Sequence, residues 1–101
     1  MASRPASESD DRDQPPRIQA AKAVRAALEQ LGVLLGREPE GVSALAPQDS
    51  GWTVEVEVVE LYRVPDSTSV LATYTVDLDG DGELLGYRRV RRYTRGQVNR
   101  D

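Results

Sequence analysis

The sequence contains no cysteine, no histidine and no phenylalanine. Without cysteine and histidine, the chain lacks disulfides, thiolate and imidazole metal sites, and the usual nucleophile and general base of neutral-pH catalysis. No apolar run is longer than three residues, and the N-terminus lacks the apolar segment of a secretory signal. We therefore expect a cytoplasmic protein with no membrane contact, no cofactor and no metal.

The length of 101 residues and the hydrophobic content of 39% predict one domain with a small core. Residues 1–16 are rich in serine, proline and charge, and we expect a disordered acidic tail there. A tail that folds on a partner is the alternative. A single α+β domain is expected over residues 17–95, and a flexible C-terminal tail over residues 96–101.

A helical period begins near Arg17 and predicts an amphipathic helix with one buried stripe. Its end is expected at Gly32 or Gly36, because glycine often terminates helices and Pro39 follows. The apolar positions that define the stripe are Ile18, Ala21, Val24, Leu28, Leu31 and Leu35.

The rest of the chain has the pattern of strands joined by short turns. A short edge strand is expected over residues 42–47, and residues 52–58 alternate apolar and polar side chains, as in a half-buried strand. The alternation breaks at Val59, which predicts a bulge or a second covered face. A second strand covers residues 70–78, and a third begins at Leu84. The expected fold class is α+β, with one N-terminal amphipathic helix packed on a three- to four-stranded antiparallel meander sheet.

Two acidic features could suggest chemistry, but neither has the complete pattern. Residues 77–83 resemble the start of a calcium-binding loop, yet Arg88 stands where the bidentate glutamate is required, so a hairpin turn is the better interpretation. Glu55 and Glu57 lie on a polar strand face without the burial that raises a carboxyl pKa. We therefore expect no catalytic residues and a protein that is not an enzyme.

Charge is strongly segregated, because residues 50–87 carry a net charge of −7 and residues 88–101 carry +5. Within residues 87–93, a large apolar or aromatic residue recurs at every third position with an arginine pair between, which predicts a bulged or strongly twisted edge strand. These arginines could pair with the acidic strand faces or form a recognition surface. Exposed ion pairs contribute only about 0–1 kcal/mol each, so four arginines exceed what stability requires.

Four ordered blocks of the chain resemble the gas vesicle protein GvpO family. The match extends over roughly residues 18–95, and its blocks are residues 51–60, residues 63–66, residues 70–74, and residues 82–93 around Gly86-Tyr87-Arg88-Arg89 and Arg92-Tyr93. The resemblance implies a non-enzymatic accessory protein that serves or modulates assembly of the gas vesicle shell. It also implies a cytoplasmic location, with association with gas vesicles as a further expectation.

Two mechanisms follow from the resemblance and the charge pattern together. An assembly factor would bind the shell subunit or other accessory gas vesicle proteins, whereas a regulator of gas vesicle gene expression would bind nucleic acid through the arginine strand. Nucleic acid is the less favoured partner because the acidic strand opposes it, and the exposed strand edges permit a homodimer. The candidate partner-binding residues are Val59, Leu61, Tyr62, Tyr87, Arg88, Arg89, Arg91, Arg92, Tyr93 and Arg95.

Overall fold

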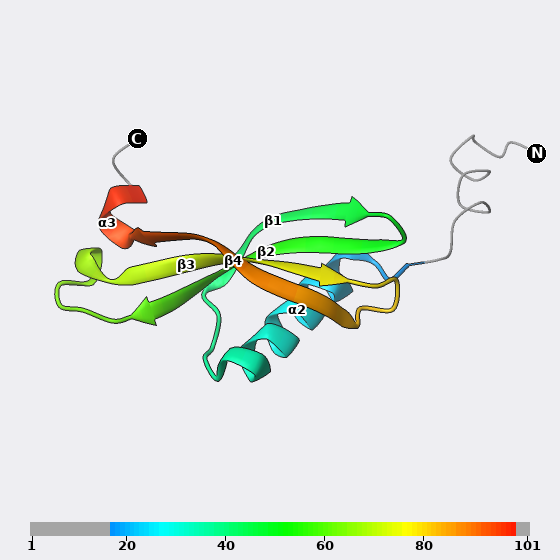
Figure 1. Cartoon of the computed structure of the whole chain (residues 1–101), viewed down its shortest axis with the longest axis horizontal. Helices are drawn as coiled ribbons and strands as arrows, with labels where there is room; N and C mark the ends of the chain where they lie inside the picture. The colour runs from blue at the N-terminus through cyan, green and yellow to red at the C-terminus, as the bar shows by residue number, and fades with distance from the viewer. Residues whose placement is uncertain (1–16, 99–101) are drawn as a thin grey trace, which may run out of the picture.

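The computed structural model describes residues 17–98 and places one helix against a four-stranded antiparallel sheet (Figure 1). The helix α2 spans Ala20–Leu35. The strands β1 (Gly41–Gln48), β2 (Gly51–Leu61), β3 (Val70–Leu78) and β4 (Leu84–Thr94) lie in the order β1-β2-β3-β4. The short helices η1 (Asp66–Thr68) and α3 (Arg95–Val98) complete the elements of the described residues. The predicted α+β class and antiparallel meander are confirmed.

Helix α2 lies under one half of the sheet, whereas η1 and α3 lie at the opposite end (Figure 1). Its contact face is formed by Ala23, Ala27 and Leu31, which are fully buried and recur every fourth residue along one side of the helix. The small alanine side chains let the helix backbone approach the sheet closely. The predicted stripe was therefore wrong at Ala21, which is exposed. Alanine occurs on several faces of this helix, so the apolar pattern alone did not fix its rotation.

The helix ends at a left-handed glycine, as the sequence predicted. Gly36 has φ 68°, and its N–H donates to the carbonyl oxygen of Gly32 at 2.8 Å. Glycine adopts this conformation without the steric cost that a Cβ atom imposes.

The core lies between α2 and the centre of the sheet. Val54, Val56 and Val58 of β2 are fully buried, and Val76 and Leu78 of β3 pack into the same cluster. The indole Nε1–H of Trp52 donates to the carbonyl oxygen of Ile18 at 2.9 Å, which fixes the segment before α2 against β2. The alternation predicted for residues 52–58 is thus confirmed.

Bulges interrupt the sheet at the positions where the sequence pattern changes. The β2 register with β3 shifts between Val59 and Leu61, so Glu60 has no partner residue on β3. Arg37 donates to the carbonyl oxygens of Val59 and Glu60 at 3.0 and 2.9 Å and so holds this bulge. In β4, the register skips Val90. The bulges predicted after Val58 and within the arginine segment are confirmed.

The expected tails fall mostly outside the described part of the chain. Residues 1–16, the proposed acidic tail, lie outside the described residues, as do residues 99–101. Residues 95–98 form the short helix α3. Within residues 17–98, none of the helices is both long and apolar enough to span a bilayer.

Candidate binding surface

Strand β4 forms one edge of the sheet and divides its arginines between the two sheet faces. Cross-strand partners point to the same face. Arg88 and Arg91 lie opposite Thr75 and Thr73, on the face away from α2. Arg89 and Arg92 lie opposite Tyr74 and Ala72, on the α2 face, as does Tyr87 opposite Val76. Because the register skips Val90, Arg89 and Arg92 lie on the same face although they are three residues apart, and so do Arg88 and Arg91.

The two arginines on the α2 face are held by Glu60. The Glu60 carboxylate accepts hydrogen bonds from Arg92 Nε at 2.9 Å, Arg89 Nη1 at 3.1 Å and the Tyr74 hydroxyl at 2.9 Å. The Glu60 side chain is only 14% exposed, whereas about half of each arginine side chain reaches solvent. Burial acts to raise the pKa of Glu60, but the three hydrogen bonds outweigh it and hold the pKa below its ordinary value.

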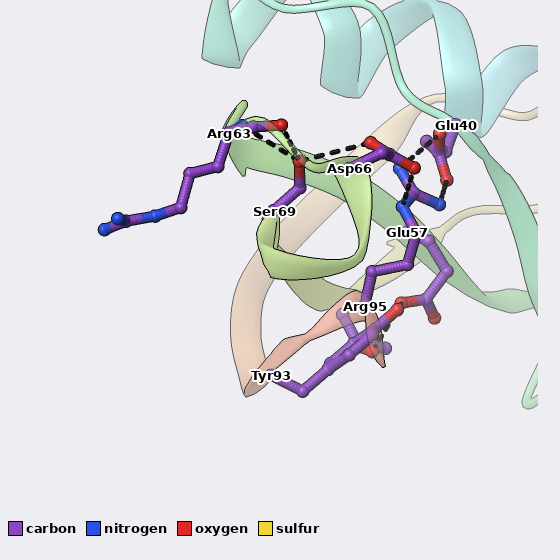
Figure 2. Close-up of polar contacts among 8 residues, drawn as sticks. Glu40, Glu57, Arg63, Asp66, Ser69, Tyr93 and Arg95 are labelled. Atoms are coloured by element: carbon purple, nitrogen blue, oxygen red, sulfur yellow. Dashed lines mark hydrogen bonds and ion pairs between the residues drawn. The ribbon is translucent and has the colours of Figure 1, made fainter. Parts of the chain in front are cut away.

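A second acidic group, Glu57, organises the face away from α2. Its carboxylate accepts hydrogen bonds from Ser43 Oγ at 2.6 Å, Thr73 Oγ1 at 2.8 Å and the Tyr93 hydroxyl. Figure 2 shows the Tyr93 and Glu57 side chains meeting. Burial opposes ionisation of Glu57, yet these hydrogen bonds and the charge of Arg91 lower its pKa overall.

Tyr93 and Arg91 are therefore both engaged within the protein. The Arg91 guanidinium lies 4.5 Å from the centre of the Tyr93 ring, within the range of a cation–π contact. Burial and the hydrogen bond to Glu57 raise the pKa of Tyr93 to about 12. Arg88, by contrast, makes no side-chain hydrogen bond or ion pair with residues 17–98.

Arg95 ties the end of β4 to two distant segments (Figure 2). Its guanidinium donates to both carboxylate oxygens of Glu40, each at 3.1 Å. Its Nε lies 2.8 Å from Asp66 Oδ2, an ion pair that lacks hydrogen-bond geometry. The hydrogen bonds to Glu40 raise the pKa of Arg95, with the Glu40 and Asp66 charges acting in the same direction. This arginine links α3 to η1 and to the residue that precedes β1.

The structure thus separates the sequence candidates into engaged and available groups. Val59 is buried and offers no contact surface, whereas Leu61, Tyr62 and Tyr87 are exposed. Sequence reasoning missed Leu85, Val90 and, most of all, Val64, whose side chain is 98% exposed. An isolated apolar residue in a turn gives no periodic signal that would have identified it. Whether any of these residues contacts a partner stays a prediction.

The acidic turn after β3 is built as a hairpin. Asp79 Oδ1 accepts hydrogen bonds from the backbone N–H groups of Asp81 and Glu83, both at 2.9 Å, so this oxygen organises the turn itself. Gly82 has φ 92° and supplies the positive φ that the turn requires. Within residues 17–98, no three acidic side chains gather as they would around a metal ion.

Comparison with known proteins places the chain among gas vesicle proteins. The profile of the family described as "Gas vesicle synthesis protein GvpO" matches residues 6–99. The chain is 52% identical over 88 residues to "Gas vesicle protein O" of a Streptomyces strain, covering 87% of this chain and 67% of that protein. It is 38% identical to "Gas vesicle protein O1" of Halobacterium salinarum, over 67% of this chain, and 36% identical to "Gas vesicle protein O" of Haloferax mediterranei, over 74%.

The matched region is only part of the haloarchaeal relatives, since it spans 57% of the Halobacterium protein and 54% of the Haloferax protein. No solved structure matches the chain significantly.

Proposed function

The chain belongs to the GvpO family of gas vesicle synthesis proteins, and from that premise we propose that it is a non-enzymatic accessory protein of gas vesicle assembly. It acts in the cytoplasm by binding the shell subunit or another accessory gas vesicle protein. Its contact surface includes the outer edge of β4 and the exposed end of β2.

The single observation that carries the proposal is the combination of apolar and cationic groups on the β4 edge. Leu85, Tyr87 and Val90 are exposed along this strand, and Arg88, in the same segment, has no carboxylate partner in residues 17–98. Covering apolar side chains with a partner lowers the free energy of the complex. An arginine on the same strand can steer and orient that partner. Protein interfaces are enriched in tyrosine and arginine for this reason.

The ionisation of the described carboxylates supports a role without catalysis. A general base near neutral pH works best with a pKa close to the working pH. Glu57 and Glu60 have lowered pKa values, and their carboxylate oxygens accept hydrogen bonds from neighbouring side chains. These two groups therefore stabilise the sheet and remain anionic.

The distribution of charge also bears on the partner. Arg89 and Arg92 share Glu60, which reduces the positive field available to a phosphate backbone. Two β4 edges facing each other would bring like charges together, so a homodimer would use another surface. A regulator that binds nucleic acid is the second candidate, and the exposed arginines of β4 are the observation that favours it.

Affinity capture from vesicle-forming cells tests the proposal. Wild-type protein is expected to enrich the shell subunit or another accessory gas vesicle protein, and Arg88→Glu is expected to reduce that enrichment. Arg25→Glu is the matched control, because Arg25 is exposed on α2 and has no hydrogen-bonding or ionic partner in residues 17–98.

Failure of the wild-type protein to enrich any gas vesicle protein would contradict the assembly role. Enrichment that Arg88→Glu leaves unchanged would remove β4 from the contact surface. Binding of RNA or DNA by the purified protein, weakened by added salt and by Arg88→Glu, would favour the regulator instead.

A further inference from the structure

The connection between β2 and β3 presents large side chains that the fold does not use. The Tyr62 side chain is 74% exposed and Val64 is 98% exposed, and Figure 2 shows the Arg63 side chain extending away from the neighbouring residues. Single exposed apolar residues are common and prove little by themselves. The informative second feature is that polar contacts, one of them to a fully buried serine, anchor this loop.

The first anchor is Ser69, which is fully buried. Its Oγ accepts a hydrogen bond from the backbone N–H of Arg63 at 3.0 Å and donates one to Asp66 Oδ1 at 3.2 Å. The Thr68 hydroxyl donates to the carbonyl oxygen of Pro65 at 2.7 Å. These contacts fix the loop backbone immediately after Tyr62 and on the far side of Val64.

The second anchor, Arg95, joins the loop to the residue that precedes β1 at the same end of the sheet (Figure 2). Arg95 pairs with Asp66 and with Glu40, and its backbone N–H donates to the carbonyl oxygen of Ser69 at 2.9 Å. A Cβ atom at Gly96 would lie 2.9 Å from the carbonyl oxygen of Ser67, so α3 packs tightly against η1. The loop is thus held from two sides while its tip reaches solvent.

We propose that residues 62–64 form a preorganised anchor for a partner protein. Tyr62 and Val64 enter an apolar pocket of that partner, and Arg63 pairs with a carboxylate at the pocket rim. The inference rests on the proposed function in taking the partner to be a protein of gas vesicle assembly. Ser69, Asp66 and Arg95 are positioning residues, because they act by holding the loop.

Physical chemistry favours a protein over nucleic acid as the partner of this loop. Ordering a loop on binding costs free energy, and a loop already fixed in the free protein avoids much of that cost. Tyrosine and arginine are the residues that most often dominate the binding energy of protein interfaces. Carboxylates at the loop base, Asp66 and Glu40, repel a phosphate backbone but leave the Arg63 side chain free to meet a single acidic residue.

Photo-crosslinking in vesicle-forming cells tests the contact. A photoreactive phenylalanine derivative replaces Tyr62, and the same derivative replaces Val33 as the control, because Val33 is 77% exposed on α2. We expect position 62, and not position 33, to crosslink to a gas vesicle protein. Mass spectrometry of the crosslinked peptide should place an aspartate or glutamate beside an apolar segment. Adding Arg63→Glu should lower the yield at least about tenfold, whereas adding Arg25→Glu should not.

The outcomes distinguish this inference from the proposed function. If the wild-type protein captures a gas vesicle protein but position 62 does not crosslink to it, the anchor is wrong and the proposed function stands. A crosslink only to nucleic acid or to a second copy of the chain also overturns the anchor. If no gas vesicle protein is captured at all, the proposed function itself fails.

Hydrogen exchange tests whether the loop of residues 62–64 is ordered before it binds. Ser69→Ala removes the hydroxyl that accepts from the Arg63 amide, so hydrogen exchange of that amide should accelerate and the crosslink yield at position 62 should fall. Ser50→Ala is the control, since the Ser50 hydroxyl has no partner within residues 17–98. Faster exchange with an unchanged crosslink yield would show that the contact needs no prior ordering.

Discussion

Replacing Glu60 by alanine is the most direct perturbation of this fold. Glu60 sits at the β2 bulge and binds Tyr74, Arg89 and Arg92, so one carboxylate links the end of β2 to β3 and β4. Removing it leaves two arginines without their anion and one tyrosine hydroxyl without its acceptor. We expect Glu60→Ala to fold and to be clearly less stable than the wild type.

The size of the loss follows from the exposure of each partner. The arginine side chains are half exposed, so each ion pair contributes about 0.5–1 kcal/mol after solvent screening. The hydrogen bond from the part-buried Tyr74 hydroxyl adds about 1 kcal/mol. The expected decrease in the free energy of unfolding is therefore about 2–3 kcal/mol. For a domain of this size, such a loss lowers Tm by on the order of 10 °C.

Urea denaturation followed by Trp52 fluorescence measures this loss. Glu55→Ala is the matched control, because Glu55 lies on the same strand and its carboxylate has no hydrogen-bonding or ionic partner in residues 17–98. The control should change stability by less than about 0.5 kcal/mol. Equal unfolding midpoints for Glu60→Ala and the wild type would refute the assignment of Glu60 as the anchor of the β4 arginines.

Glu60 should also make the free energy of unfolding depend on pH in the acidic range. The pKa of Glu60 in the folded protein lies below its ordinary value of 4.5, so folding favours the ionised form. The stabilisation is complete above the unfolded-state pKa and is lost as pH falls through the lowered folded-state pKa. Glu60→Gln should therefore lose less stability than the wild type when pH is lowered from neutral into this acidic range. Parallel pH profiles for the two proteins would contradict the pairing.

Other predictions rest on separate parts of the structure. Tyr93 should be the last tyrosine to ionise in an ultraviolet titration, at a pKa of about 12, so its contribution to stability should persist below about pH 10 and vanish as pH rises through about 12. Tyr93→Phe should remove that final step. Gly51→Ala should cost about 3 kcal/mol in urea denaturation, because its Cβ would meet a β3 carbonyl oxygen at 1.9 Å, whereas Gly41→Ala meets nothing and should be nearly neutral. Leu31→Ala should cost about 2–5 kcal/mol by the same assay, and Leu34→Ala, on the exposed face, less than about 0.5 kcal/mol.

Strand β2 was predictable because its side chains alternate over residues 52–58. In β2, valines at every second position can only face one side of a pleated strand, so Val54, Val56 and Val58 identified the core face directly. The helix was predictable as a helix but not in its rotation. Alanine is apolar enough to be buried and small enough to be exposed. Ala21 is exposed, whereas Ala27 is buried.

The candidate site was only partly predictable, because its electrostatics depend on register. The sequence indicates an arginine-rich edge and a break in alternation near Val59. It does not indicate that the bulge brings Glu60 within reach of Arg89 and Arg92 on the α2 face. A turn could be expected near residues 64–68, but its anchoring by Arg95 was missed for a related reason. Arg95 donates its backbone N–H to Ser69 and pairs with Asp66, and only the folded sheet brings these residues near it.

The division of the arginines has a consequence for how a partner is recognised. Two of the four cations in β4 share one carboxylate, which offsets only one of their two charges, and a third stacks on Tyr93. A surface that recognised a partner by charge density alone would lose strength from each of these contacts. Internal pairing instead rigidifies the edge and leaves Arg88 as the one cation unpaired within residues 17–98 on a strand that also exposes Leu85, Tyr87 and Val90. Such a surface favours shape and apolar fit over total charge, which is why we expect a protein partner there and only a modest effect of salt on binding.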